Sequence, residues 1–466
     1  MYKNASLDDT IVAISTAAGV GGIGIIRLSG PEAVTIADRM FIVKDGKKPS
    51  KFESHTVHYG WVVKPENNAD VVDEALLTVM RAPKSYTKED VVEISCHGGI
   101  VSLKSILTII TELGGRLAEP GEFTKRAFLN GRIDLTQAEA VLDIIQAKTS
   151  AFLRVSTHQL KGELALELAE IREQIMSVYT QLEAVINFPE DEIDAQGKQQ
   201  ISGRIAEARD RIEKLLISSE QGRLLKEGIK IVICGRPNVG KSSLLNVLLK
   251  QPRAIVSDIA GTTRDTIEET AQIKGIPFQL VDTAGILQPR DFIEEEAVKR
   301  SRLYIQGADL ALLVLDQSRD LSKEDRDLAE TLKEQNVIVV LNKCDLNNHI
   351  DTSTIHRLLP DRKIISISAL HKTGIEELQD AVVETVLHGT VVSPHGILIS
   401  NLRHINALKA GAAALDRGIG LLQQGLSFEF VSEELKISIN ELDGITGRNI
   451  DADLLDQIFS SFCIGK

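Results

Sequence analysis

The chain has 466 residues, of which 43% are hydrophobic and 26% are charged, a composition typical of globular proteins and not of disordered or fibrous ones. A chain of this length is expected to form about three domains. Its 53 Lys and Arg against 66 Asp and Glu give a formal net charge of -13, which excludes a broadly basic nucleic-acid coat but not a small basic patch or a basic partner.

Three features of the sequence predict a cytoplasmic protein. The first residues, MYKNASLDDT, lack the charged-then-apolar layout of a signal peptide. No uninterrupted apolar run reaches the 18 or so residues that span a bilayer, so no membrane association is expected. The four cysteines are scattered and predict neither a disulfide framework nor a zinc site: Cys96, Cys234, Cys344 and Cys463.

Residues 1–122 are predicted to form an N-terminal α+β domain. Apolar, β-branched runs at 10–14, 23–28, 75–80 and 91–95 are typical of strands. Helical stretches at 32–40 and 100–113 alternate with them, and Gly and Pro separate the elements.

Residues 123–225 and 386–466 are predicted to be helical. Apolar residues recur at three- and four-residue steps over 160–185 and again over 402–422, and a further helix is expected over 199–218. Each apolar face needs a partner. The two parts could form separate bundles, but one helical domain with another domain inserted into it is the more economical arrangement.

Residues 226–385 are predicted to form an α/β domain with a mainly parallel sheet. Short, strongly apolar strand candidates lie at 229–234, 278–281, 310–315, 337–341 and 364–367, with helical stretches between most of them.

The first of these strands runs directly into a phosphate-binding loop. Gly235-Arg-Pro-Asn-Val-Gly-Lys241-Ser242, the P-loop, has the pattern G-x-x-x-x-G-K-[ST] and is followed by a predicted helix over 243–249. Its glycines let backbone N–H groups surround phosphate oxygens, and the helix N-terminus adds a positive dipole end. Lys241 is predicted to reach the β- and γ-phosphates and to act in catalysis, and the Ser242 hydroxyl to bind Mg²⁺.

Further motifs follow in the order of a GTP-binding domain. In Asp282-Thr-Ala-Gly285 the carboxylate can hold a magnesium water, and upstream Thr263 is predicted to complete the magnesium shell when the γ-phosphate is present. In Asn342-Lys-Cys-Asp345 the last carboxylate accepts hydrogen bonds from guanine N1–H and the 2-amino group, a pair of donors that adenine lacks. The domain therefore resembles the GTPase branch of the P-loop proteins, and GTP hydrolysis is its predicted activity.

The backbone after the last strand is placed to contact guanine O6. The residues predicted to contact GTP all lie in these loops. They are Asn238, Val239, Gly240, Lys241, Ser242, Ser243, Ser257, Asp258, Ile259, Ala260, Gly261, Thr262, Thr263, Asp282, Thr283, Ala284, Gly285, Asn342, Lys343, Asp345, Ser368 and Ala369. Many small GTPases carry a water-positioning Gln after D-x-x-G, but Ile286 stands there, so another group must act. Downstream acids begin a predicted helix, which explains most of them as N-terminal dipole partners: Asp291, Glu294, Glu295 and Glu296.

Three segments outside the GTPase domain resemble one family. Asp9-Thr-Ile-Val-Ala with Gly21-Gly-Ile-Gly-Ile-Ile-Arg27-Leu-Ser-Gly30 is similar to its N-terminus, and the stretch from Pro120-Gly-Glu-Phe-Thr-Lys-Arg-Ala to Gln-Ala-Glu-Ala140 to its most diagnostic internal segment. The chain ends in Phe462-Cys-Ile-Gly-Lys466, similar to its C-terminal signature. The chain thus resembles the tRNA-modification GTPases of the MnmE (TrmE) type over essentially its full length.

That resemblance implies a specific architecture and activity. Members have an N-terminal folate-binding domain that also forms a homodimer, a helical domain, and a GTPase domain inserted into the helical one. With an FAD-containing partner, MnmG (GidA), they form a heterotetrameric or larger complex. The complex adds a carboxymethylaminomethyl or aminomethyl group to C5 of the wobble uridine of certain tRNAs. The one-carbon unit comes from a tetrahydrofolate derivative, the 5,10-methylene or 5-formyl form.

The resemblance also assigns residues. Those that fall on folate-contacting positions are Arg27, Glu93, Arg132 and Lys466. Many members have Lys where this chain has Arg132, which keeps the charge but not the geometry. For each of these residues a surface ion pair is the alternative role.

In the GTPase domain the resemblance implies a potassium site formed by Asn238, Ser257, Ile259 and Thr262. From the residues alone, Asn238 could equally serve only to shape the P-loop. Glu294 aligns with the acid that orients the hydrolytic water, although residues 287–293 before it depart from the commoner family sequences.

Two alternatives use the same GTPase motifs. A ribosome-assembly GTPase would use them as an RNA-binding switch, and a signalling or scaffold protein as a GTP-dependent dimer. Neither requires the folate-like N-terminal domain or the terminal Cys-Ile-Gly-Lys, and these features discriminate them from a tRNA-modifying enzyme.

Overall fold

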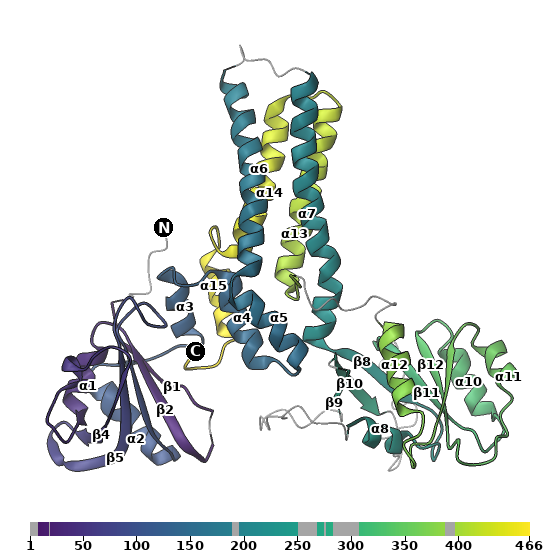
Figure 1. Ribbon diagram of the computed structural model, residues 1–466, viewed down its shortest axis with the longest axis horizontal. Coiled ribbons are helices and arrows are strands. Elements are labelled where there is room, and N and C mark those ends of the chain that lie inside the picture. Colours follow the sequence, from purple (N-terminus) through teal and green to yellow (C-terminus); the bar gives the residue numbers. More distant parts are fainter. Residues whose placement is uncertain are drawn as a thin grey trace. The chain divides into compact units, whose positions relative to one another are not determined.

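The computed structural model describes residues 8–17, 19–188, 195–249, 268–274, 276–282, 307–386 and 397–466 (Figure 1). The chain divides into two compact units. The first comprises Met1–Leu142, Gln159–Met176 and Leu435–Lys466, and the second Asp143–His158 and Ser177–Glu434.

The first unit contains a seven-stranded sheet in the order β3-β4-β5-β6-β2-β1-β7. Its strands are β1 (Ile11–Ile14), β2 (Gly21–Ser29), β3 (Phe41–Ile42), β4 (Thr56–Lys64), β5 (Asn67–Met80), β6 (Val91–Gly98) and β7 (Arg116–Leu117). Neighbouring strands are antiparallel except β1 and β7, which are parallel. The helices α1 (Ala33–Met40) and α2 (Ile100–Glu112) contribute side chains to the same hydrophobic core as the strands, because alternate strand residues point toward them.

Short helices complete the first unit beside the sheet. They are α3 (Glu122–Leu129), the start of α4 (Leu135–Gln146) and α15 (Ala452–Ser460). A small core joins α4 and α15 through Leu135, Leu455 and Phe459. An ion pair at 2.6 Å between Arg172 Nε and Asp443 Oδ1 links the parts of α6 (Glu163–Asn187) and α14 (Phe428–Thr446) that belong to this unit.

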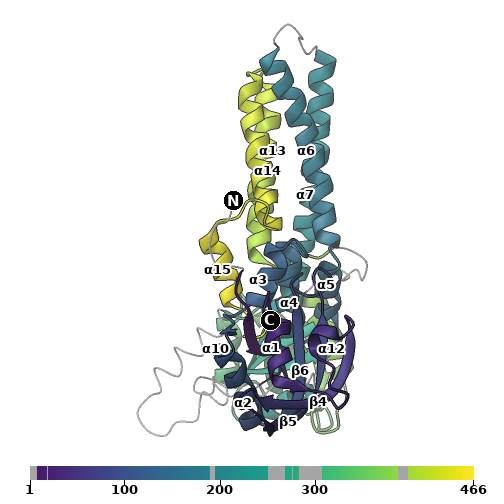
Figure 2. The ribbon, with the colours of Figure 1, turned by 90° about the vertical axis from the view of Figure 1, so that its left-hand side faces the viewer.

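In the second unit, α7 (Ala195–Glu227) and α13 (Leu402–Gln423) run alongside one another (Figures 1 and 2). Arg209 of α7 and Asp416 of α13 form an ion pair at 3.4 Å. The parts of α6 and α14 in this unit are linked by a hydrogen bond from the Ser432 hydroxyl to Glu183. Arg204 of α7 contacts Gln181 of α6, and Arg417 of α13 contacts Glu434 of α14. Each helix thereby gains the partner face that its apolar periodicity required. The helix α5 (Ser150–Leu160) places Phe152 in the core of the α/β domain.

The α/β domain has a six-stranded sheet in the order β13-β12-β11-β8-β10-β9. Its strands are β8 (Ile229–Cys234), β9 (Glu268–Ile273), β10 (Ile276–Asp282), β11 (Leu310–Asp316), β12 (Val337–Asn342) and β13 (Lys363–Ile367). All pairs are parallel except β9 with β10. Its helices among the described residues are α8 (Lys241–Leu249), α10 (Lys323–Thr331), α11 (Thr352–Leu358) and α12 (Ile375–Val386). Apolar side chains on both sides of the sheet are buried, as the continuous apolar strands predicted.

The predicted fold class is confirmed, with an α+β N-terminal part, long helices and an α/β domain that interrupts them in sequence. Every predicted strand is present, and most extend one or more residues further. Four strands were missed: β3, β4, β7 and β9. The boundaries at 122, 225 and 385 stay predictions, because α6 and α14 each run through both compact units. Among the helices that the structure describes, none is both long enough and apolar enough to cross a membrane.

Candidate functional site

Three sequence motifs meet at one edge of the α/β sheet: the P-loop, Asn342–Asp345 and Ser368–Ala369. The P-loop follows β8, and the parallel strands β11, β12 and β13 end beside it. The carboxyl ends of parallel strands lie at the same edge, where ligands bind in open α/β sheets. The structure therefore brings together the segments that the sequence assigned separately to phosphate and base.

The P-loop lies close against its neighbours, and its glycines are required for this. A Cβ at Gly235 would lie 2.3 Å from the Val314 carbonyl oxygen, and one at Gly240 would lie 2.1 Å from Asn342 Nδ2. Both have a positive φ that other residues rarely adopt (+146° and +100°). Lys241 is 5% exposed, and its ammonium donates to the carbonyl oxygens of Gly235 and Arg236 at 2.7 and 2.8 Å.

The P-loop and the first turn of α8 present the groups that bind a phosphate and its cations. Ser242 and Ser243 are exposed on the first turn of α8, where the helix dipole favours an anion. The Lys241 ammonium suits a phosphate, and the neighbouring Ser242 hydroxyl suits the Mg²⁺ ion that accompanies the phosphate. Ser242 would supply one oxygen ligand to Mg²⁺. Asn238 is exposed and has a φ of 65°. Its side chain contains the neutral amide oxygen that a weakly hydrated monovalent cation prefers.

Asn342 holds three loops together. It is 2% exposed, and its side-chain Nδ2 donates to the Val239 carbonyl oxygen at 2.8 Å. Its Oδ1 accepts the backbone N–H of Ala369 at 3.0 Å. The amide thus joins the P-loop, the end of β12 and the loop after β13. The Ala369 N–H, placed by the sequence near guanine O6, donates to this amide.

Asp345, the predicted reader of guanine, is held by the loop after β13. Its Oδ1 accepts the Ser368 hydroxyl at 2.5 Å, and Ser368 in turn accepts the backbone N–H of His371 at 3.2 Å. The hydrogen bond from Ser368 lowers the pKa of Asp345, so the carboxylate that guanine would face is ionised at neutral pH.

The sequence missed one acid at this edge. Asp316 ends β11, and its carboxylate accepts the Lys343 ammonium at 2.5 Å. No motif marks an Asp at a strand end. The one indication in the sequence is that Asp316 directly follows the predicted strand 310–315, which ends at the same edge of the sheet as the strand before Asn342.

Other predicted residues of this site lie outside the described residues. They are the potassium and magnesium loop with Ser257, Asp258, Ile259, Ala260, Gly261, Thr262 and Thr263, the segment Thr283, Ala284 and Gly285, and Glu294. Asp282 ends β10 and pairs in parallel register with Ile233 of β8. These assignments stay predictions.

In the first unit, three of the four predicted folate residues gather around the last residues of the chain. Arg27 and Glu93 are opposite one another on β2 and β6, and Arg27 Nε donates to Glu93 Oε1 at 2.7 Å. Arg27 Nη1 also donates to the Gly465 carbonyl oxygen at 3.2 Å, and Ser15 Oγ donates to the same oxygen at 3.1 Å. Lys466 follows Gly465 directly.

Arg132 joins this group through an aromatic ring that the sequence missed. The Tyr86 ring centroid lies 4.8 Å from the Arg132 guanidinium carbon and 5.8 Å from that of Arg27. The Phe123 ring lies 5.7 Å from Arg27. Two guanidinium groups, a carboxylate and two rings fit a flat heterocycle that carries an acidic tail, which is the chemistry of a folate.

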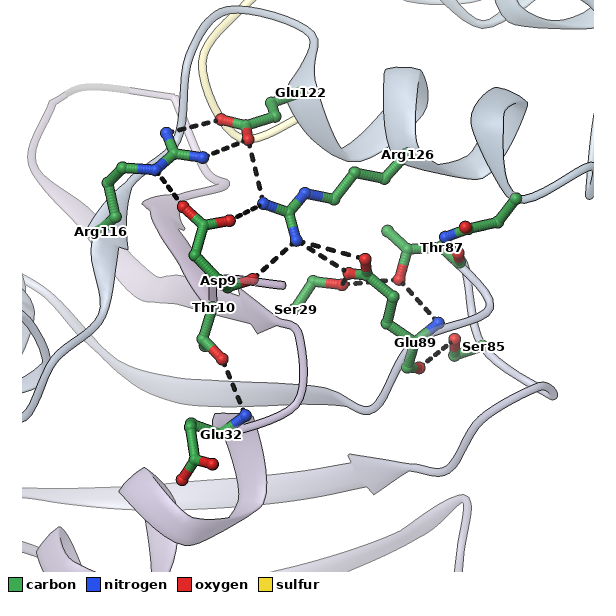
Figure 3. Close-up of polar contacts among 11 residues, drawn as sticks. Asp9, Thr10, Ser29, Glu32, Ser85, Thr87, Glu89, Arg116, Glu122 and Arg126 are labelled. Atoms are coloured by element: carbon green, nitrogen blue, oxygen red, sulfur yellow. Dashed lines mark hydrogen bonds and ion pairs between the residues drawn. The ribbon is translucent and has the colours of Figure 1, made fainter. Parts of the chain in front are cut away.

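A buried ionic cluster beside this group fixes α3 to the sheet (Figure 3). Arg126 of α3 is 2% exposed and donates to Asp9, Glu89 and Glu122, with its Nη2 at 2.5 Å from Asp9 Oδ1. Arg116 pairs with both Asp9 and Glu122. Burial alone would raise the pKa values of Asp9 and Glu122, but hydrogen bonds from the two arginines outweigh it and lower both.

The comparisons with known proteins cover nearly the whole chain. The family model described as "GTP-binding protein TrmE N-terminus" matches residues 10–132, and "MnmE helical domain" matches residues 135–463. Three similar proteins carry the name tRNA modification GTPase MnmE. The Alkaliphilus oremlandii protein is 43% identical over 99% of this chain and all of its own length. The Clostridioides difficile protein is 47% identical over 99% of this chain and 100% of its own length. The Bacillus subtilis protein is 45% identical over 98% of this chain and 100% of its own length.

Proposed function

The chain belongs to the MnmE family of tRNA modification GTPases, and we propose that it modifies C5 of the wobble uridine, position 34, in certain tRNAs. The group added is carboxymethylaminomethyl or aminomethyl, and the chain acts as a cytoplasmic homodimer with an FAD-containing partner of the MnmG (GidA) type. The predicted family and the predicted GTPase activity in tRNA modification are confirmed. The ribosome-assembly alternative therefore has no remaining support. Nucleoside analysis of tRNA from cells lacking the chain tests the wobble assignment.

The observation that carries this proposal is the group formed by Arg27, Glu93 and Gly465. A GTP-dependent switch has no need for a second site that combines arginines, a carboxylate and aromatic rings. A reaction that adds a carbon to a base needs a one-carbon donor, and a tetrahydrofolate in the 5,10-methylene or 5-formyl form supplies one when bound. In this site a guanidinium of Arg27 or Arg132 would hold the acidic tail of the folate, and the Glu93 carboxylate would accept N–H groups of its ring.

The GTPase residues have separate tasks in hydrolysis. Lys241 would neutralise charge on the β- and γ-phosphates, and Asp345 would select guanine. Ser242 and Thr263 would hold Mg²⁺, and Glu294 would orient the attacking water. K⁺ held by Asn238 with Ser257, Ile259 and Thr262 would add positive charge beside the phosphates, where many GTPases place an arginine.

Deletion of Lys466 is expected to abolish binding of 5-formyltetrahydrofolate and to leave GTP affinity unchanged. The reason is that the Gly465 carbonyl oxygen accepts hydrogen bonds from Arg27 and Ser15, which brings the next residue, Lys466, to the edge of the proposed folate site. Isothermal titration with the folate and with GTP measures both affinities on one preparation. Lys44→Ala, at an exposed position of the same domain, is the control and should bind folate normally. Unchanged folate affinity after the deletion would remove Lys466 from the site.

Replacing K⁺ by Na⁺ at constant ionic strength is expected to slow GTP turnover at least tenfold, or about 1.4 kcal/mol of activation free energy. GTP affinity should change little, because the ion acts mainly where charge develops during hydrolysis. Steady-state rates and nucleotide titrations in the two salts test this. Equal wild-type rates would exclude the cation mechanism.

Two variants locate the ion. Asn238→Ala should make the rate insensitive to the choice of cation, while Glu294→Ala should lower the rate and keep the K⁺ response. Because Asn238 has a φ of 65°, Asn238→Gly removes the side chain without backbone strain. It should give the same insensitivity. A K⁺ response that survives in both Asn238 variants would place the ion elsewhere.

A further inference from the structure

The carboxylate of Asp316 is almost enclosed at the end of β11, with 3% of its side chain exposed. Its Oδ1 accepts the backbone N–H of Ser318 at 3.0 Å and the Ser318 hydroxyl at 2.7 Å. Its Oδ2 accepts the Lys343 ammonium at 2.5 Å. In the sheet, Asp316 is the register partner of Asn342, so Lys343 is the first residue beyond that pair. Both carboxylate oxygens are therefore used at the edge where the nucleotide motifs meet.

The same ammonium makes a second contact, which joins two loops. Lys343 Nζ donates to the carbonyl oxygen of Asn238 in the P-loop at 3.1 Å. Lys343 and Asn238 have φ values of 67° and 65°. Residues other than glycine rarely adopt this left-handed conformation, and it persists only where the surroundings fix it. The bridge thus connects two backbone positions that each need an external constraint.

The charges at this point are complementary: the Asp316 carboxylate is buried, and the side chain of Lys343 is 31% exposed. Burial alone would raise the pKa of Asp316, but hydrogen bonds from Lys343 and Ser318 outweigh it and lower the pKa. The carboxylate is therefore ionised at neutral pH and attracts the ammonium, and water screens the pair from the lysine side only. Without that carboxylate, the remaining acceptor of the Lys343 ammonium among the described residues would be the neutral Asn238 carbonyl oxygen.

We propose that Asp316 is a positioning residue for guanine-nucleotide binding, which acts through Lys343. By holding the Lys343 ammonium on the Asn238 carbonyl, it keeps the base-reading segment Asn342–Asp345 and the P-loop in one fixed arrangement. A nucleotide that touches both segments then pays less conformational entropy on binding. Asp316 itself touches neither base nor phosphate, so its loss should weaken affinity and leave the chemical step nearly intact.

Asp316→Asn tests this, because the amide keeps the shape of the carboxylate and removes its charge. The dissociation constants for GDP and GTP, and the KM for GTP, are expected to rise about tenfold, the scale of one charge-assisted contact. The value of kcat at saturating GTP should stay within about twofold of wild type. Unchanged affinity, or a fall in kcat with KM unchanged, would overturn the proposal.

Asp351→Asn is the matched control. Asp351 accepts the backbone N–H and the hydroxyl of Ser353, two residues further on, as Asp316 does with Ser318. It does so at the start of α11, and its hydrogen-bond partners among the described residues are Ser353 and Thr354, with no lysine. This variant makes the same change to the same kind of local contacts without affecting a lysine, so its nucleotide affinity should equal that of wild type. A tenfold loss here as well would show that the Asp316 effect is a general one on stability.

Lys343→Met and the double variant with Asp316→Asn show whether Asp316 acts through the lysine. Once the ammonium is gone, removal of the carboxylate should weaken GTP binding no further, so the two losses are not additive. A double variant that binds markedly more weakly than Lys343→Met would contradict the proposal. If the single Asp316→Asn variant does not fold, the comparison of Lys343→Met with the double variant still tests the proposal, since the double variant removes both charges of the ion pair together.

Discussion

Asp345→Asn is expected to lower GTP affinity about a hundredfold, because two hydrogen bonds to a charged group contribute roughly tenfold or more each. The carboxylate accepts both guanine donors, whereas the amide offers one acceptor and turns an NH₂ group toward guanine. Xanthosine triphosphate has a carbonyl in place of the 2-amino group and can accept that NH₂. The variant should therefore bind xanthosine triphosphate more tightly than wild type does.

Competition titrations with GTP and xanthosine triphosphate measure this exchange. The gain in xanthosine triphosphate binding is its own control, because a misfolded domain would lose both nucleotides. Since the hydrogen bond from Ser368 lowers the pKa of Asp345, the wild-type preference for GTP should be constant across neutral and mildly acidic pH. Retained GTP preference in Asp345→Asn would show that the segment Asn342–Asp345 does not read guanine.

Arg126→Met is expected to destabilise the first unit by about 3–5 kcal/mol, the usual result of removing one partner from a buried ionic cluster. The methionine fills much of the volume of the arginine but leaves Asp9, Glu89 and Glu122 without their shared cation (Figure 3). The one tryptophan of the sequence, Trp61, lies on β4 in this unit. Its fluorescence therefore follows unfolding of the first unit during a urea titration.

Lys125→Met is the control for Arg126→Met, on the same helix and with the same replacement. The Lys125 ammonium pairs with Asp456, whose side chain is 65% exposed, and pairs of this kind contribute at most about 1 kcal/mol. The urea midpoint reported by Trp61 should move much less than in Arg126→Met. Equal shifts in the two variants would show that the buried cluster does not stabilise the unit.

The same cluster predicts how the first unit responds to acid. The pKa values of Asp9 and Glu122 are lower in the folded protein than in the unfolded chain. Their contribution is therefore complete above the unfolded values, near pH 4–4.5, and is lost as pH falls through the folded values. In Arg126→Met this loss should be smaller, because one of the two arginines that lower both pKa values is gone while Arg116 remains. Urea titrations at pH 6 and pH 3.5, followed by Trp61 fluorescence, measure how much stability each protein loses between the two pH values.

The parts of the fold that could be predicted are those where one short segment contains the whole signal. The strand Ile229–Cys234 was predicted with its observed bounds, because parallel strands covered on both faces are continuously apolar. The edge strand β9, Glu268–Ile273, is mostly polar and was missed. Its own residues do not show a strand pattern, and only its antiparallel pairing with β10 identifies it as a strand. The strand β4 was missed because His58 and Gly60 interrupt its apolar residues.

The candidate sites divide in the same way. Phosphate and guanine impose fixed spacings, so Lys241 and Asp345 could be found from sequence. Arg27 and Gly465 are 438 positions apart, and no local pattern shows that they touch. The diagnostic stretch around Arg126 identified the family, but only the structure shows that this arginine binds Asp9 and Glu89 from other segments, as well as Glu122 on its own helix. Asp316 has no signature at all, because its role depends on the register of β11 and β12.

Nucleoside mass spectrometry of tRNA from cells lacking this chain tests its role at the wobble uridine most directly. Carboxymethylaminomethyl and aminomethyl derivatives of uridine should disappear, and they should return when the wild-type chain is expressed again. Modified nucleosides from other tRNA positions should keep their levels and serve as the internal standard. Unchanged wobble uridine derivatives in cells shown to lack the chain would contradict the proposed function.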